Sequence, residues 1–137
     1  MRRRIFISKS YILLVILIFS CQPRDMLNIK AKNLINQELA HIEEFLNPKT
    51  KYVNGRHMGS VLFLEQLTNI ESESPGNYIG KYRPTVQDLE KWKEWYAKNK
   101  LNVLWMPQKN KIGVQEKNPN GAIKIREVNE QPWIRID

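Results

Sequence analysis

Cysteine is the scarcest residue type in this 137-residue chain, since Cys21 is the only one. A single cysteine cannot form a disulfide within the chain, although many small secreted domains depend on such bonds. We therefore expect the stability of the protein to come from an apolar core alone. Four tryptophans and numerous leucine, isoleucine and valine residues make such a core feasible in one domain.

Recognisable catalytic motifs are also missing. The sequence contains no Gly-x-Ser-x-Gly elbow, no glycine-rich phosphate loop and no His-Glu-x-x-His zinc motif. Because catalytic groups can still meet from distant positions, these absences weaken the case for an enzyme without excluding one. The sequence therefore predicts no catalytic residue and no cofactor.

No apolar run is long enough to span a membrane. The longest, residues 11–19, would extend about 14 Å as a helix, whereas a hydrocarbon core is about 30 Å thick. The small residue Ser20 follows this run, and basic residues precede it at Arg2, Arg3, Arg4 and Lys9. This order predicts a secretory signal peptide over residues 1–20.

The end of this run, Ile18-Phe19-Ser20-Cys21, resembles the lipobox of bacterial lipoproteins. The resemblance implies cleavage before Cys21, attachment of lipid to its sulfur and acylation of the new amino terminus, with palmitate as a typical chain. Residues 21–26 would form a lipid-anchored tether, in which 22–26 reach at most about 18 Å. By the sorting rule of two-membrane bacteria, Gln22 beside the cysteine implies the outer membrane more than the inner.

The charge balance argues against one class of partner. The full chain has a net charge of +8, but four basic residues would leave with the signal peptide, so the remainder has +4. A charge of this size, spread over residues 21–137, does not predict nucleic-acid binding. It favours loose attraction to anionic lipid or polymer surfaces, which salt screens.

Hydrophobic periodicity predicts helices before residue 101. Apolar residues at steps of three and four indicate a helix over residues 27–46. A second helix is expected over 61–70, with Ser60 as its N-cap. The third, over 85–100, begins with Thr85-Val86-Gln87-Asp88, which resembles a capping box.

The last third of the chain changes to the two-residue period of β-strands. Residues 101–106 are expected to be extended. Alternating segments then flank Asn118-Pro119-Asn120-Gly121, whose order suits a type I turn followed by a G1 bulge. A further short strand is expected near Trp133.

These elements predict an α+β fold, in which two to three helices pack on a small C-terminal antiparallel hairpin sheet. We expect a single globular domain over residues 27–137, mostly helical over 27–106 and mostly β over 107–137. The sequence contains no internal repeat and no low-complexity tract that would divide this domain.

Aromatic side chains are the candidates for a binding site. Flat rings can stack on sugars, and Trp95 and Trp105 are the rings proposed for such stacking. The alternative is that these rings supply core area, which their helical spacing favours. Leu89, Trp92 and Tyr96 form one stripe that predicts a buried face, whereas Trp95 lies about 60° from its centre.

Glu38 and His41 have the spacing of the Glu-x-x-His unit found in di-metal helical bundles. Such a site needs a second unit from another helix. The only other histidine, His57, is expected in a loop with no carboxylate nearby in sequence. We therefore expect a solvent-facing pair and no metal site.

Residues 64–105 resemble a recurring pattern in small uncharacterised secreted and lipoprotein sequences of bacteria. The residues that carry the resemblance are Leu64-Glu65-Gln66-Leu67-Thr68, Asp88-Leu89, Trp92, Trp95-Tyr96, Asn99 and Leu104-Trp105. A similar pairing of a Leu-x-x-Leu-Thr helix with a Trp-x-x-Trp helix occurs beside HEAT-like helical repeats. The pattern is structural and implies no catalytic residue.

The sequence thus predicts a lipid-anchored cell-envelope protein, held at a membrane through Cys21. We expect it to bind a protein partner in the envelope as a non-enzymatic structural or accessory subunit. The alternative is a glycan-binding module that uses exposed rings, with Trp95 and Trp105 as the stacking residues. A small hydrolase or its inhibitor is a third and weaker class.

Overall fold

The computed structural model describes residues 23–50, 55–74, 76 and 83–129, with side chains from residue 28 onward. Within these residues the helices are α2 (Pro23–Leu46), α3 (Arg56–Thr68) and α4 (Val86–Asn99). The strands are β1 (Val103–Met106), β2 (Lys111–Lys117) and β3 (Ile123–Glu127). They form one antiparallel sheet in the order β1-β2-β3, so the predicted α+β class is confirmed.

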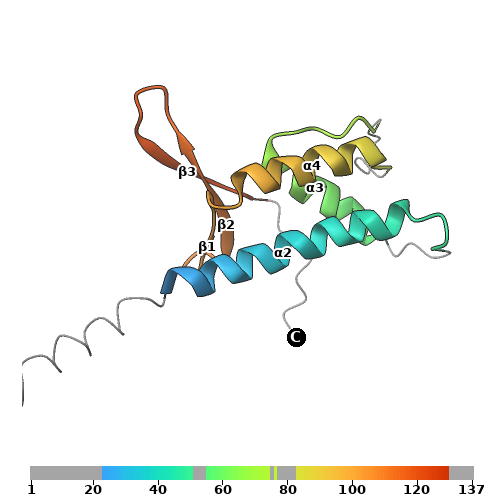
Figure 1. The fold of residues 1–137 in the computed structure, drawn as a ribbon, viewed down its shortest axis with the longest axis horizontal. Helices are drawn as coiled ribbons and strands as arrows, with labels where there is room; N and C mark the ends of the chain where they lie inside the picture. Colours follow the sequence, from blue (N-terminus) through green and yellow to red (C-terminus); the bar gives the residue numbers. More distant parts are fainter. Residues whose placement is uncertain (1–22, 51–54, 75, 77–82, 130–137) are drawn as a thin grey trace, which may run out of the picture.

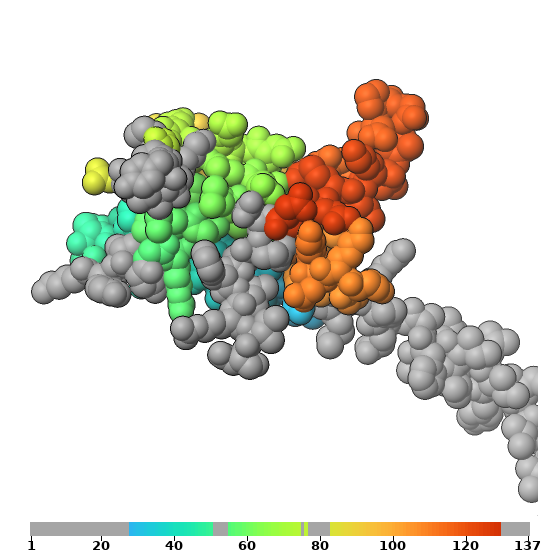
Figure 2. Space-filling model, turned by 180° about the vertical axis from the view of Figure 1, so that it is seen from behind, coloured from blue at the N-terminus to red at the C-terminus, as the bar shows by residue number. Residues whose placement is uncertain are grey.

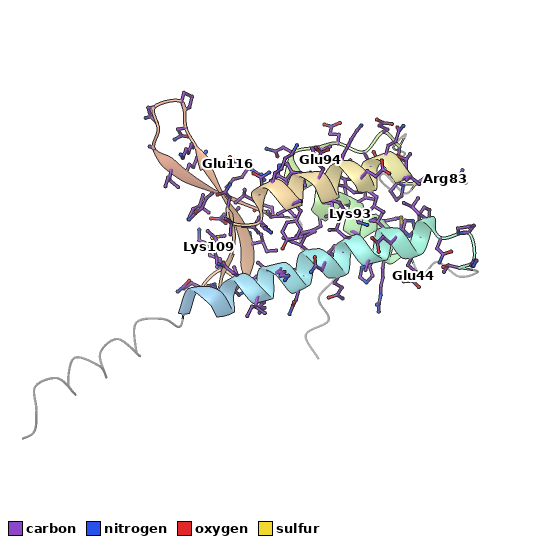
Figure 3. The ribbon with its side chains drawn as sticks, in the orientation of Figure 1. Glu44, Arg83, Lys93, Glu94, Lys109 and Glu116 are labelled. Atoms are coloured by element: carbon purple, nitrogen blue, oxygen red, sulfur yellow. The ribbon has the colours of Figure 1, made fainter. Side chains whose placement is uncertain are left out.

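α2 is the longest helix and forms the base on which the other elements pack. α3 and α4 lie along one side of it, and β1 contacts it near its N-terminal end (Figure 1). An ion pair between Lys93 of α4 and Glu43 of α2 spans two of the helices, and Figure 3 shows Lys93 on the side of α4 that faces α2. The hairpin of β2 and β3 projects away from the helices (Figure 1).

α2 begins earlier than the sequence predicts. Its first residue is Pro23 rather than Leu27, so residues 23–26 are helical. Proline is well tolerated at the first position of a helix, because the N–H that it lacks would have no intrahelical partner there. The last four residues of the expected tether over 21–26 are therefore helical.

α3 also begins earlier than expected, and Ser60 lies inside it instead of capping it. The helix follows directly on Gly55, whose φ of 76° places it in the left-handed region, and Asn69 follows its last residue at φ 57°. The added first turn brings His57 into the helix, where its ring stacks on Phe45 with the centroids 4.0 Å apart. The loop expected around His57 is therefore wrong.

α4 begins with the predicted capping box. The Thr85 hydroxyl accepts from the N–H of Asp88 at 3.1 Å, and the Asp88 carboxylate accepts from the N–H of Thr85 at 2.8 Å. The same carboxylate accepts from the Ser72 hydroxyl at 2.8 Å and from the N–H of Glu73 at 2.9 Å. Burial raises the pKa of Asp88, but these hydrogen bonds to the charged form outweigh burial and hold the pKa below its ordinary value.

Trp92, one turn after Asp88, lies fully buried in the core. Its Nε1 donates to the carbonyl of Ile70 at 3.1 Å, so the one polar atom of the ring has a partner. Leu89 is buried as well, and Tyr96 packs against the core, which confirms the predicted stripe of α4. Other large buried side chains come from every layer of the fold: Ile35, Ile42, Phe63, Leu64, Leu67 and Ile112.

β2 and β3 form the predicted hairpin. The N–H of Gly121 donates to the carbonyl of Asn118 at 2.8 Å, and Gly121 has the positive φ, 81°, that this turn requires. The segment expected to be extended over residues 101–106 contains β1, which lies at the other edge of the sheet. The strand expected near Trp133 lies outside the described residues.

We predict that Gly121→Val destabilises the domain by about 1–2 kcal/mol. A Cβ at this position would meet no other atom within 4 Å, so the cost is strain in the left-handed backbone and not a clash. Gly121→Asn is the matched control, because asparagine tolerates this conformation and should cost less. Urea denaturation measures both variants, and equal stability of the two would contradict the assigned turn.

Candidate functional site

A groove of about 400 Å³ lies between the end of α3, the C-terminal half of α4 and the hairpin. Its lining combines one aromatic ring with several amide side chains. Those residues are Trp95, Asn69, Asn99, Asn102 and Gln115. An aromatic ring beside amide donors and acceptors suits a ligand that has both flat apolar faces and hydroxyl groups.

α4 places Trp95 beside its buried stripe and not on it. The ring is partly buried and packs against the core, while it also lines the groove. Asn99, one turn later, donates from Nδ2 to the carbonyl of Trp95 at 2.8 Å, which orients its amide. Trp95 therefore has the partial exposure that its off-stripe position in the sequence indicates.

Arg126 lines one wall of the groove and joins β3 to α3. The sequence analysis did not predict this role. Its Nη2 donates to the carbonyl of Leu67 at 3.0 Å and its Nη1 to the carbonyl of Gln66, at the C-terminal end of α3. Its Nε donates to Glu116, which Figure 3 shows on the hairpin. A cation at a helix C-terminus donates hydrogen bonds to carbonyls that have no intrahelical partner. It also interacts favourably with the negative end of the helix dipole. The sequence signal for this role is a charged residue at a position of β3 that pairs with the buried Val114 of β2.

Trp105 is not available for stacking on a ligand. Only 3% of it is exposed, because β1 turns Val103 and Trp105 toward the core. The ammonium group of Lys30 on α2 lies 4.0 Å from the centroid of its ring. The proposed stacking role of Trp105 beside Trp95 is therefore wrong, since Trp105 is a core residue and only Trp95 lines the groove.

Glu38 does not face solvent, contrary to expectation, and His41 is partly buried. Glu38 is buried, and its carboxylate accepts from the Ser60 hydroxyl of α3 at 2.6 Å. His41 Nδ1 lies 3.3 Å from Ser60 Oγ and 3.5 Å from Glu38 Oε2. The set contains the side-chain types of a nucleophilic triad, but Ser60 has no exposed surface and a substrate cannot reach it. The cluster joins α2 to α3.

The described residues contain no group of three histidine, cysteine, aspartate or glutamate side chains that could hold a metal ion. None of the helices that the structure describes is both long and apolar enough to cross a bilayer.

Comparison of the chain with protein-family models, with curated proteins and with solved structures finds no match.

Proposed function

We propose that this chain is a lipid-anchored cell-envelope protein that acts by binding and not by catalysis, with the outer membrane as its location. The apolar run that ends at Ser20-Cys21 supports the anchor. The start of α2 at Pro23 adds to this argument, because a rigid helix two residues after the lipid would hold the domain close to its membrane.

The polar groups of the domain support a non-enzymatic role. The serine, histidine and glutamate cluster is closed to substrates because Ser60 is fully buried. Four amide side chains line the groove beside Trp95, and amides do not transfer protons at neutral pH. Of its charged residues, Glu116 is paired with Arg126, and the third is Lys117.

The single observation that carries the proposal is the exposed apolar edge of the sheet. β3 is an edge strand in the described part of the chain, and 67% of Ile123 and 45% of Ile125 are exposed. Ile125 pairs with Gln115 and Ile123 with Lys117, positions that alternate along β2 with the buried Val114. Ile123 also borders the groove beside Trp95. Figure 2 shows the hairpin extending beyond the body. An open strand edge beside exposed isoleucines can pair with a strand of another protein.

We predict that a photoreactive amino acid at position 123 crosslinks one envelope protein in intact cells. The control position is Val86, which is also exposed but lies at the start of α4, away from the hairpin. Ile123→Glu should weaken recovery of the same partner about tenfold, because it places a charge in the apolar contact. Identical crosslinking from positions 123 and 86 would contradict binding through the hairpin.

For the anchor, we predict that Cys21→Ala abolishes incorporation of a labelled fatty acid and cleavage by the lipoprotein pathway. The reason is that the thiol is the attachment point and two or more acyl chains are needed for stable membrane binding. Gln22→Ala, which leaves the thiol in place, should remain labelled. Fatty-acid labelling that persists in Cys21→Ala would end the lipoprotein proposal.

A glycan is the second candidate ligand, and the groove lined by Trp95 is the observation that favours it. A single ring, surrounded by amides from the C-cap of α3, from α4 and from the sheet, could stack on one sugar and hydrogen-bond its hydroxyl groups. The buried position of Trp105 removes the second ring that a longer stacking platform would need.

We predict that Trp95→Ala weakens cosedimentation with peptidoglycan at least about tenfold and costs much less stability than Trp92→Ala, because the Trp95 ring is only partly buried. Trp92→Ala is the matched comparison, and it should instead cost about 3–5 kcal/mol of stability because its ring is fully buried. Thermal denaturation and a sedimentation assay separate the two effects. Failure of the wild-type protein to sediment with any envelope glycan would remove this candidate.

A further inference from the structure

A second hollow, of about 390 Å³, lies where the start of α2 meets the end of α4. Asn28, Ile29 and Lys32 of α2 line one side of it, and Tyr96, Lys100 and Leu101 line the other. This is the end of the molecule at which α2 begins, and Figure 2 shows the light-blue start of α2 beside the orange residues around β1. We call the surface formed by Ile29, Lys32, Lys100 and Leu101 the anchor face.

The anchor face has two large apolar side chains that are exposed to solvent. Leu101 is 86% exposed and Ile29 is 51% exposed. An isolated exposed leucine is ordinary on a protein surface, but here both flank the same hollow. Burying the pair in an apolar medium would be favourable in proportion to the area removed from water.

Two lysines accompany these apolar side chains. Lys32 and Lys100 are exposed and line the same hollow, and neither forms an ion pair with another described residue. In contrast, Lys91, Lys93 and Lys98 of α4 each pair with a glutamate. Apolar residues beside unneutralised lysines are the composition of surfaces that lie on anionic bilayers.

We propose that the anchor face docks on the surface of the anionic phospholipid bilayer that holds the chain. This inference rests on the proposed lipid at Cys21. From that residue to Pro23 the chain spans at most about 7 Å, and Ile29 lies about 9 Å further along α2. The lipid would therefore hold the anchor face, and not the far end of the helices, within reach of the headgroups. This raises the effective concentration of the anchor face at the bilayer surface.

The bilayer is the occupant that the charges favour. An apolar groove for a partner helix would need no lysines at its edge, whereas anionic headgroups attract each of them within a Debye length. Leu101 lies in the turn after α4, two residues beyond Asn99, so its side chain can enter the boundary between headgroups and acyl chains while the helix stays above it.

The test uses the mature lipidated protein, in which Cys21 has no free thiol, reconstituted in vesicles. Leu101→Cys carries an NBD fluorophore, and Val86→Cys with the same label is the matched control about 20 Å away at the other end of α4. In vesicles with phosphatidylglycerol, lipid-bound nitroxide should quench the label at position 101 at least twofold more than the label at position 86. The difference should shrink in pure phosphatidylcholine and at high salt.

Charge reversal provides the second arm of the test. Lys32→Glu combined with Lys100→Glu should remove the extra quenching at position 101, whereas Lys49→Glu, in the turn beyond the opposite end of α2, should leave it unchanged. Equal quenching at positions 101 and 86 in protein that is attached to vesicles would overturn the docking proposal alone. Failure of every variant to attach would contradict the lipid anchor itself, and with it this orientation.

Discussion

The arrangement of α3 and α4 depends on the buried carboxylate of Asp88. It accepts hydrogen bonds from Thr85, Ser72 and Glu73, so one group caps α4 and holds the segment after α3 against it. That segment presents the carbonyl of Ile70 to the ring nitrogen of Trp92. Trp92 is the largest buried side chain of the core, and its ring nitrogen therefore has a partner because Asp88, one turn earlier on α4, holds this segment in place.

The buried polar groups described above hydrogen-bond one structural element to another. Glu38 and Ser60 join α2 to α3, and Asp88 joins the segment after α3 to α4. In a domain held together without a disulfide among its described residues, such buried hydrogen bonds define one arrangement of helices that apolar packing alone would leave less specific.

The C-terminal end of α4 separates two surfaces. Trp95 and Asn99 are four residues apart and line the groove, whereas Tyr96 and Lys100 are displaced by one position and line the hollow of the anchor face. Each residue turns the helix by about 100°, so a shift of one position moves a side chain to a different side. One short helix can therefore contribute to ligand binding on one side and to membrane contact on another.

Local signals in the sequence determined the fold class, the capping box at Thr85 and the hairpin turn at Gly121, because each depends on residues within a few positions of one another. The signal peptide and the lipid on Cys21 stay predictions. Only the tertiary structure decided the environments of Trp105 and Glu38. A two-residue period assigns Trp105 to one face of β1, but that face is buried because α2 packs against it. Glu38 is likewise buried because its partner Ser60, 22 residues away, lies on another helix that packs over it.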